Sequence, residues 1–138
     1  MIYHSFRLFQ SSEISPIIRQ LMMSPDWVDG TTSATGKTKQ IKKNLQLSYN
    51  SDVYRDLSKK ISDILMNNMT VLDRFIFPKR IINILFSRTS TGMYYGTHID
   101  LPHTKSGRRD YSFTLFLNDL NFVLSNAACK LSSLLQKP

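Results

Sequence analysis

The clearest structural signal in this chain is the stretch DYSFTLFL at residues 110–117. Apolar and aromatic side chains at positions 111, 113, 115 and 117 alternate with Ser112, Thr114 and Phe116. Successive side chains of a strand point to opposite faces of a sheet, so this alternation predicts a strand with one face in the core. We expect this strand to belong to an antiparallel sheet.

Several other segments have the patterns of strands. Alternating or continuous short apolar runs predict strands at residues 2–9, 41–47, 80–86 and 94–100. In the second of these, Lys42, Asn44 and Gln46 share one face and the more apolar residues share the other. Residues 29–40 are rich in Gly, Thr, Ser and Lys and predict a loop, as do residues 101–109.

Two segments have the patterns of helices. Ser12 and Ser15 are candidate N-caps of a first helix that continues to about residue 22, with Pro16 in its first turn. Ser51 begins a second helix, in which apolar residues recur with a 3.6-residue period as far as residue 65. The expected fold class is therefore α+β, with N-terminal helices packed on an antiparallel sheet.

The composition indicates one globular domain with a modest core. The chain has 138 residues, of which 41% are hydrophobic and 11% aromatic. No run of about 18 apolar residues is present, and residues 1–7 lack the pattern of a signal peptide. The single cysteine, Cys129, excludes an internal disulfide and is expected to be an inert thiol. These features predict a cytoplasmic protein with no membrane partner.

A formal net charge of +8 would suit an acidic partner such as a nucleic acid. Part of that charge lies in Lys37, Lys39, Lys42 and Lys43, which have no interleaved aromatic residues that could stack on bases. We expect these lysines to form a solvated face. A basic nucleic-acid-binding protein is kept as an alternative.

The segment Thr97-His98-Ile99-Asp100 carries the main candidate metal site. Residues i and i+2 of a strand project the same way, so His98 and Asp100 could bind one metal ion together. They would supply two of the three ligands of a 2-His-1-carboxylate site, which is typical of non-haem Fe(II) oxygenases. This spacing also arises by chance, and a solvated pair is the alternative. His103 lies in an expected loop, and we predict an exposed histidine there rather than a third ligand.

Three blocks around this pair resemble the PKHD-type hydroxylases, a branch of the 2-oxoglutarate- and Fe(II)-dependent dioxygenases related to the prolyl 4-hydroxylase alpha subunit. The first block is WVDGT at 27–31 with IKKNLQL at 41–47. The second runs from FSR at 86–88 through GMYYG at 92–96 to Asp100, and the third is RDYSFTLFLND at 109–119. Their order and spacing are those of the family. The resemblance implies a double-stranded β-helix, or jelly roll, of which this chain would hold an incomplete part.

The resemblance stops after Asp119. Residues 120–138 read LNFVLSNAACKLSSLLQKP and do not match the family. We therefore expect residues 1–119 to be the N-terminal part of an oxygenase domain and residues 120–138 to be an aberrant tail, left by truncation or a frameshift. The family's second iron-binding histidine and its 2-oxoglutarate-binding arginine have no counterpart here, and Arg109 is not that arginine. The resemblance therefore predicts an inactive or crippled fragment.

By the same resemblance, the implied cofactors are Fe(II), 2-oxoglutarate and L-ascorbate, with His98 and Asp100 as metal ligands. The implied substrate is a small molecule or a peptidyl group, and a free amino acid, a peptidyl proline and a modified side chain all remain open. A different class of function is also kept: a non-catalytic binding module that reuses the half-barrel and associates with a partner through its open sheet edge.

Four further residues are candidates for the site. Thr89 stands where the family commonly has a tyrosine beside the 2-oxoglutarate pocket. Tyr95 matches an aromatic of that pocket, but on a regular strand it would point away from His98, and packing in the core is the alternative. Asn44 and Gln46 are candidates for substrate binding, with hydrogen bonds to neighbouring backbone as the alternative.

Overall fold

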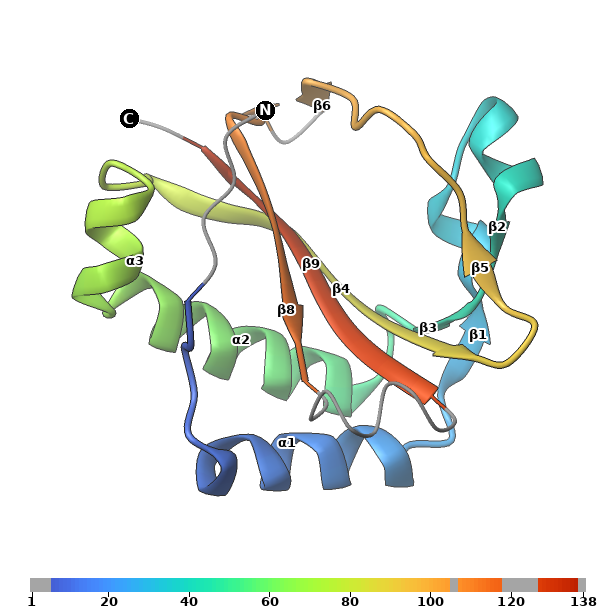
Figure 1. The fold of residues 1–138 in the computed structure, drawn as a ribbon, viewed down its shortest axis with the longest axis horizontal. Coiled ribbons are helices and arrows are strands. Elements are labelled where there is room, and N and C mark those ends of the chain that lie inside the picture. The colour runs from blue at the N-terminus through green and yellow to red at the C-terminus, as the bar shows by residue number, and fades with distance from the viewer. Residues whose placement is uncertain (1–5, 105–106, 118–126, 137–138) are drawn as a thin grey trace.

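The computed structural model describes residues 6–104, 107–117 and 127–136, and in this part of the chain the fold is α+β (Figure 1). The helices are α1 (Ser11–Met23), α2 (Asp52–Met66) and α3 (Met69–Arg74), with short 3₁₀ helices η1 (Gly30–Ser33) and η2 (Gly36–Ile41). The strands are β1 (Trp27–Asp29), β2 (Lys42–Lys43), β3 (Leu45–Leu47), β4 (Arg80–Ser90), β5 (Tyr94–Tyr95), β6 (His103–Thr104), β7 (Gly107–Arg108), β8 (Tyr111–Phe116) and β9 (Ala127–Gln136).

The main sheet has five strands in the order β1-β3-β4-β9-β8, and every neighbouring pair is antiparallel. Two further antiparallel pairs, β2-β5 and β6-β7, lie outside it. The described strands do not close into a barrel. The antiparallel α+β class predicted from the sequence is therefore confirmed.

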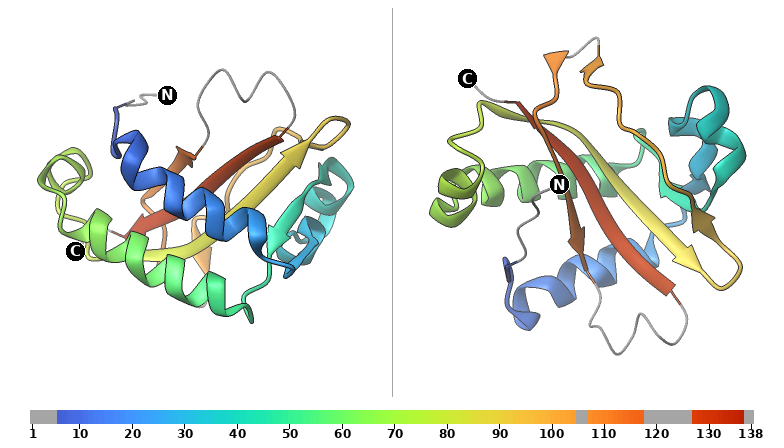
Figure 2. Two further views of the ribbon diagram at one scale, coloured as in Figure 1. Left: turned by 90° about the horizontal axis from the view of Figure 1, so that it is seen from below. Right: turned by 45° about the horizontal axis from the view of Figure 1, so that its top comes forward.

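Helices α1 and α2 lie side by side across one face of the main sheet (Figure 2). The apolar stripe of α2, Leu57, Ile61 and Leu65, is buried, as the 3.6-residue period predicts. It packs in one cluster with α1, β3 and β4, in which Phe86 is among the largest fully buried side chains. Burying such side chains is the main source of stability, and this core fixes the sheet from which the shorter strands extend.

The strongest strand prediction is also confirmed. In β8 the side chains at positions 111, 113 and 115 are partly buried while those at 112, 114 and 116 are exposed, and Leu117 is only 1% exposed. The strand expected at 80–86 forms and extends to Ser90. It contains a register shift between Ile82 and Leu85, where Asn83 has a φ of 65°, so the strand is irregular at that point.

Four segments differ from the predictions. Helix α1 begins at Ser11, after Gln10, whose backbone N–H donates to Glu13 Oε2 (2.7 Å), so Pro16 lies inside the helix rather than in its first turn. Residues 6–9 are not a strand, and residues 2–5 lie outside the described part. The expected loop at 101–109 contains the β6-β7 pair, and the loop at 29–40 contains η1 and most of η2.

The region expected to be an aberrant tail contributes to the main sheet. Residues 127–136 form β9, which pairs with β4 on one side and β8 on the other. The domain boundary at residue 119 stays a prediction. Within the described residues, no helix combines the length and apolar character needed to cross a bilayer.

Candidate functional site

His98 and Asp100 lie in an irregular segment that follows β5, not on a strand. The strand expected at 94–100 ends at Tyr95, and the next residue, Gly96, donates its backbone N–H to Ile41 O of η2 (2.7 Å). An added Cβ at Gly96 would lie 3.1 Å from Ile41 Cβ, so the close approach favours glycine. Gly96 thus marks the start of the segment that carries His98 and Asp100, called the candidate metal segment below.

Arg109 holds the other end of this segment. Its backbone N–H donates to Pro102 O (2.8 Å) and its Nη1 donates to Leu101 O (3.4 Å). Its neighbour Asp110 pairs with Arg108 (Nε–Oδ1 2.9 Å). Arg109 thus anchors the loop that carries Asp100.

The two candidate ligands face each other. His98 Nε2 lies 3.5 Å from Asp100 Oδ1, and the side chains are 26% and 46% exposed. His98 Nδ1 is 2.9 Å from Gly96 O. A carbonyl oxygen only accepts, so Nδ1 carries the hydrogen, and in a neutral imidazole the Nε2 lone pair then faces the carboxylate. Two acceptors directed at the same space suit a cation between them, and a histidine fixed through Nδ1 by a backbone carbonyl is the usual arrangement of metal ligands.

Tyr95 lies against His98, contrary to the prediction for a regular strand. Their rings stack with centroids 4.0 Å apart and an interplanar angle of 17°. This contact is possible because the strand ends at Tyr95, so the side chains of residues 96–98 need not alternate as they would on a regular strand. Burial, and then the nearby Asp100 carboxylate, raises the pKa of Tyr95. The stacked ring restricts the imidazole to one orientation; a role for Tyr95 in 2-oxoglutarate binding stays a prediction.

Lys42 is buried, so the prediction of a solvated lysine face is wrong at this position. Its side chain is 5% exposed. Its Nζ donates to Ser33 Oγ (2.7 Å) and Gln46 Oε1 (3.2 Å), and lies 4.8 Å from the centre of the Tyr95 ring. A lysine is rarely this buried unless its ammonium group has such partners. Lys42 therefore connects the β2-β3 segment with the candidate metal segment.

Asn44 and Gln46, the substrate-binding candidates, are both buried, at 4% and 3% exposed. Both amide atoms of Asn44, and Nε2 of Gln46, have no hydrogen-bond partner among the described residues. Asn44 packs over Gly30, where an added Cβ would lie 1.9 Å from Asn44 Oδ1. Among the described residues, these side chains do not form the alternative hydrogen bonds to neighbouring backbone, and their part in substrate binding stays a prediction.

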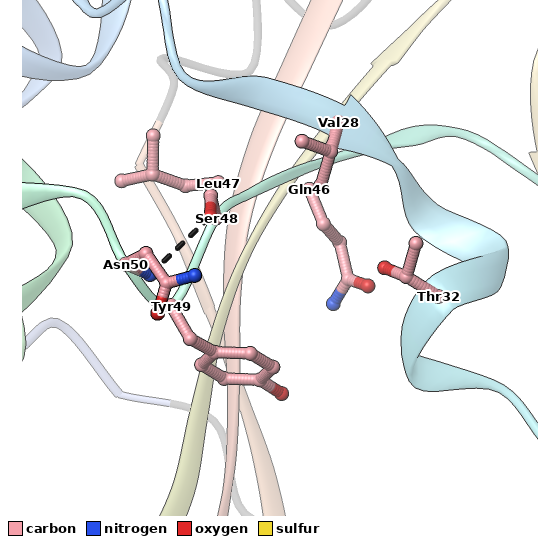
Figure 3. Close-up of a pocket in the computed structure, with 7 residues that line it drawn as sticks. All are labelled: Val28, Thr32, Gln46, Leu47, Ser48, Tyr49 and Asn50. Atoms are coloured by element: carbon pink, nitrogen blue, oxygen red, sulfur yellow. Dashed lines mark hydrogen bonds between the residues drawn. The ribbon is translucent and has the colours of Figure 1, made fainter.

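Gln46 also lines a hollow of about 330 Å³ at the end of β3. The hollow has seven lining residues: Val28, Thr32, Gln46, Leu47, Ser48, Tyr49 and Asn50 (Figure 3). Figure 3 shows the Gln46 amide extending between Thr32 and the Tyr49 ring. Partial burial raises the pKa of Tyr49 to about 12.

Among the described residues, the remaining candidates have no hydrogen bond, ion pair or ring contact with His98. Thr89 lies on β4 and pairs with Ala128 of β9. His103 is exposed on β6, as predicted. In the described residues, no group of three or more His, Cys, Asp or Glu side chains is placed to hold a metal ion. Cofactor binding by Thr89 stays a prediction, and the Cys129 side chain lies outside the described part.

Sequence patterns did not identify Lys42 and Gly96 as residues of the site. The sequence did contain a signal for Lys42. Lys42, Asn44 and Gln46 form a polar row that follows the loop at residues 29–40, and a loop can fold over such a row and bury it. No comparable signal marked Gly96, because its role depends on the approach of Ile41 from a distant part of the chain.

No family model matches this sequence. Among known proteins, it is similar to a PKHD-type hydroxylase of Prochlorococcus marinus strain MIT 9301, with 34% identity over 124 residues, 88% of this chain and 55% of the relative. A PKHD-type hydroxylase of strain NATL2A is 38% identical over 122 residues, 86% of this chain and 53% of the relative. Another, from strain MIT 9313, is 37% identical over 103 residues. The chain spans about half the length of these relatives.

Proposed function

The chain belongs by homology to the PKHD-type hydroxylases, of which it spans about half the length, and from this premise we propose that it carries part of an Fe(II)- and 2-oxoglutarate-dependent hydroxylase site. The substrate would be a small molecule or a peptidyl group. In the class that the sequence resembles, Fe(II) and 2-oxoglutarate supply the oxidising power for hydroxylation, and L-ascorbate keeps the iron reduced.

The observation that carries this proposal is the geometry of His98. Its Nδ1 is held by Gly96 O at 2.9 Å while its Nε2 faces Asp100 Oδ1 at 3.5 Å. His98 and Asp100 would hold the metal, and Gly96 and the Tyr95 ring would orient the imidazole. Thr89 is proposed for the 2-oxoglutarate pocket, and Asn44 and Gln46 for the substrate.

For the fold, we propose that the antiparallel main sheet is part of a double-stranded β-helix. Its five-stranded antiparallel order supports this, together with helices on one face only. Two protein ligands make a weaker site than three, since each lost ligand removes a strong charge-assisted or coordinate contact. We therefore propose that the 138-residue polypeptide by itself binds metal weakly and has little or no hydroxylase activity.

Titration of the purified chain with Mn(II), a redox-stable surrogate for Fe(II), tests the metal pair. We expect weak but saturable binding that is lost in both His98→Ala and Asp100→Ala. His103→Ala is the matched control, because it removes an exposed imidazole from β6, and its affinity should equal that of the unmodified chain. Unchanged affinity in His98→Ala would show that this pair is not the metal site.

A further inference from the structure

The hollow beside Gln46 has the properties of a recognition site. We propose that it is a subsite for an uncharged carbonyl group, whose oxygen accepts a hydrogen bond from Gln46 Nε2. As a place for part of a substrate it rests on the proposed function, but binding of the carbonyl group itself requires no metal.

The orientation of the Gln46 amide is decided by Lys42. Lys42 Nζ only donates, and it lies 3.2 Å from the atom assigned as Gln46 Oε1, which must therefore be the acceptor end of the amide. The other end is Nε2, a donor that is buried and has no partner among the described residues. An unpaired buried donor costs free energy, so an acceptor placed beside it would bind favourably. Figure 3 shows this amide in the space between Thr32 and Tyr49.

The lining of the hollow selects the charge of the ligand. None of its seven residues carries a formal charge. Val28 and Leu47 contribute apolar surface, and Thr32 and Tyr49 contribute hydroxyl groups. A carboxylate entering this space would lose hydration, whereas a neutral carbonyl group loses far less. The neighbouring cations lie outside the lining: the Lys42 ammonium group already has Ser33 Oγ and Gln46 Oε1 as acceptors, and Arg109 acts on Tyr49 through its charge. A ligand that offers only donors could not satisfy Nε2. A neutral amide carbonyl with small aliphatic neighbours fits both requirements.

The hollow is also connected to the candidate metal pair. Lys42 contacts Gln46 (3.2 Å) and the Tyr95 ring (4.8 Å), and that ring stacks on His98 (4.0 Å). Two side chains, Lys42 and Tyr95, therefore lie between a ligand group held at Gln46 and the His98 imidazole.

The test is an NMR titration of the metal-free, ¹⁵N-labelled chain, following the side-chain amide resonances of Gln46. N-methylacetamide is the neutral probe and acetate is the charged probe of similar size. We expect a saturable shift of the Gln46 resonances with N-methylacetamide and at least about tenfold weaker binding of acetate. Gln46→Leu, which keeps the volume and removes the donor, should lose binding. Gln40→Leu, the same change at an exposed glutamine, should keep it.

Three results would overturn the proposal: equal binding of the two probes, unchanged binding of N-methylacetamide by Gln46→Leu, or a shift that rises linearly with no saturation. If Gln46→Leu does not fold, the unmodified chain still decides through its own Gln46 resonances, and Thr32→Val provides a milder change at the rim of the hollow. Because no metal is present, failure here leaves the Mn(II) result standing. A failed Mn(II) titration would likewise leave the N-methylacetamide result standing.

Discussion

Lys42 lies directly opposite Tyr95 in the β2-β5 pair, and its ammonium nitrogen is 4.8 Å from the centre of the Tyr95 ring. The same ring stacks on the His98 imidazole. The buried Lys42 and the candidate metal ligand His98 thus share one aromatic neighbour. A mutation in the polar row of residues 42–46 should therefore affect the candidate metal segment, and a mutation in that segment should affect the polar row. A lysine beside an aromatic ring is attracted to its π face, more strongly where water is excluded.

Lys42→Met should lower the free energy of unfolding by about 1–3 kcal/mol, because Ser33 Oγ and Gln46 Oε1 would lose the donor that now satisfies them. Methionine keeps most of the aliphatic stem, so packing changes little. Urea denaturation measures the difference. Lys43→Met is the matched control: it is the adjacent residue, but exposed, and should change stability by less than about 0.5 kcal/mol. Equal effects of the two substitutions would contradict the buried role of Lys42.

Gly30→Ala should destabilise the chain, by about 1–3 kcal/mol, because the new Cβ would lie 1.9 Å from Asn44 Oδ1. Removing the obstructing amide should recover part of this loss, so the double variant Gly30→Ala/Asn44→Ala should be more stable than the additive expectation. Recovery would be incomplete, because Asn44 O would still lie 2.9 Å from the new atom. Thermal or urea unfolding of the unmodified chain, the two single variants and the double variant completes this double-mutant cycle. If the changes in unfolding free energy are strictly additive, the two residues do not contact each other.

The contact between Gly30 and Asn44 also shows what the sequence could and could not predict. The alternation at 42–46 correctly separates a polar from a more apolar face, but alternation does not say which face is covered. The structure buries the polar face because η1 folds over it, with Gly30 N–H donating to Asn44 O (2.8 Å) and Lys42 Nζ reaching Ser33. That decision depends on a tertiary contact, which local pattern does not contain.

Strand β8 and helix α2 were predictable, since each has a regular apolar period that matches its burial. The candidate pair His98 and Asp100 was also found from spacing and resemblance, although the reason offered was a shared strand face. The structure brings the side chains together on an irregular segment, held at Gly96 and Arg109. The contacts that hold the segment are those of Gly96 with Ile41 and of Arg109 with Leu101 and Pro102, and all of them involve backbone atoms, which leave no local sequence pattern.

Stability at alkaline pH should depend on Tyr49. In the unfolded chain its phenol ionises near its ordinary value of 10.0, whereas partial burial raises the pKa in the folded chain to about 12. Between these values the folded chain keeps a proton that the unfolded chain loses, so the stabilisation is complete below about pH 10 and is lost as the pH rises toward 12. The phenylalanine of Tyr49→Phe cannot ionise, so the thermal unfolding midpoint of this variant should decline less than that of the unmodified chain between about pH 9 and about pH 11. Burial also raises the pKa of Tyr54, so some decline should remain. An identical decline in both proteins would contradict this assignment.

Tyr95→Leu should weaken Mn(II) binding while leaving the metal ligands in place. The stacked Tyr95 ring limits rotation of the His98 imidazole, and Gly96 O fixes its Nδ1 at 2.9 Å. Loss of the ring leaves the single hydrogen bond to hold the orientation, and changes to the groups that support a ligand typically reduce metal affinity about 10- to 100-fold. The effect here should lie at the lower end of that range, because the hydrogen bond to Gly96 remains.

Tyr94→Leu is the matched control, since Tyr94 is the preceding residue of β5 and is 52% exposed. Calorimetric titration of both variants, with urea denaturation to correct for lost stability, separates orientation from folding. If Tyr95→Leu and Tyr94→Leu bind Mn(II) equally well, the stacked ring does not position His98, and the Gly96 carbonyl alone accounts for its orientation.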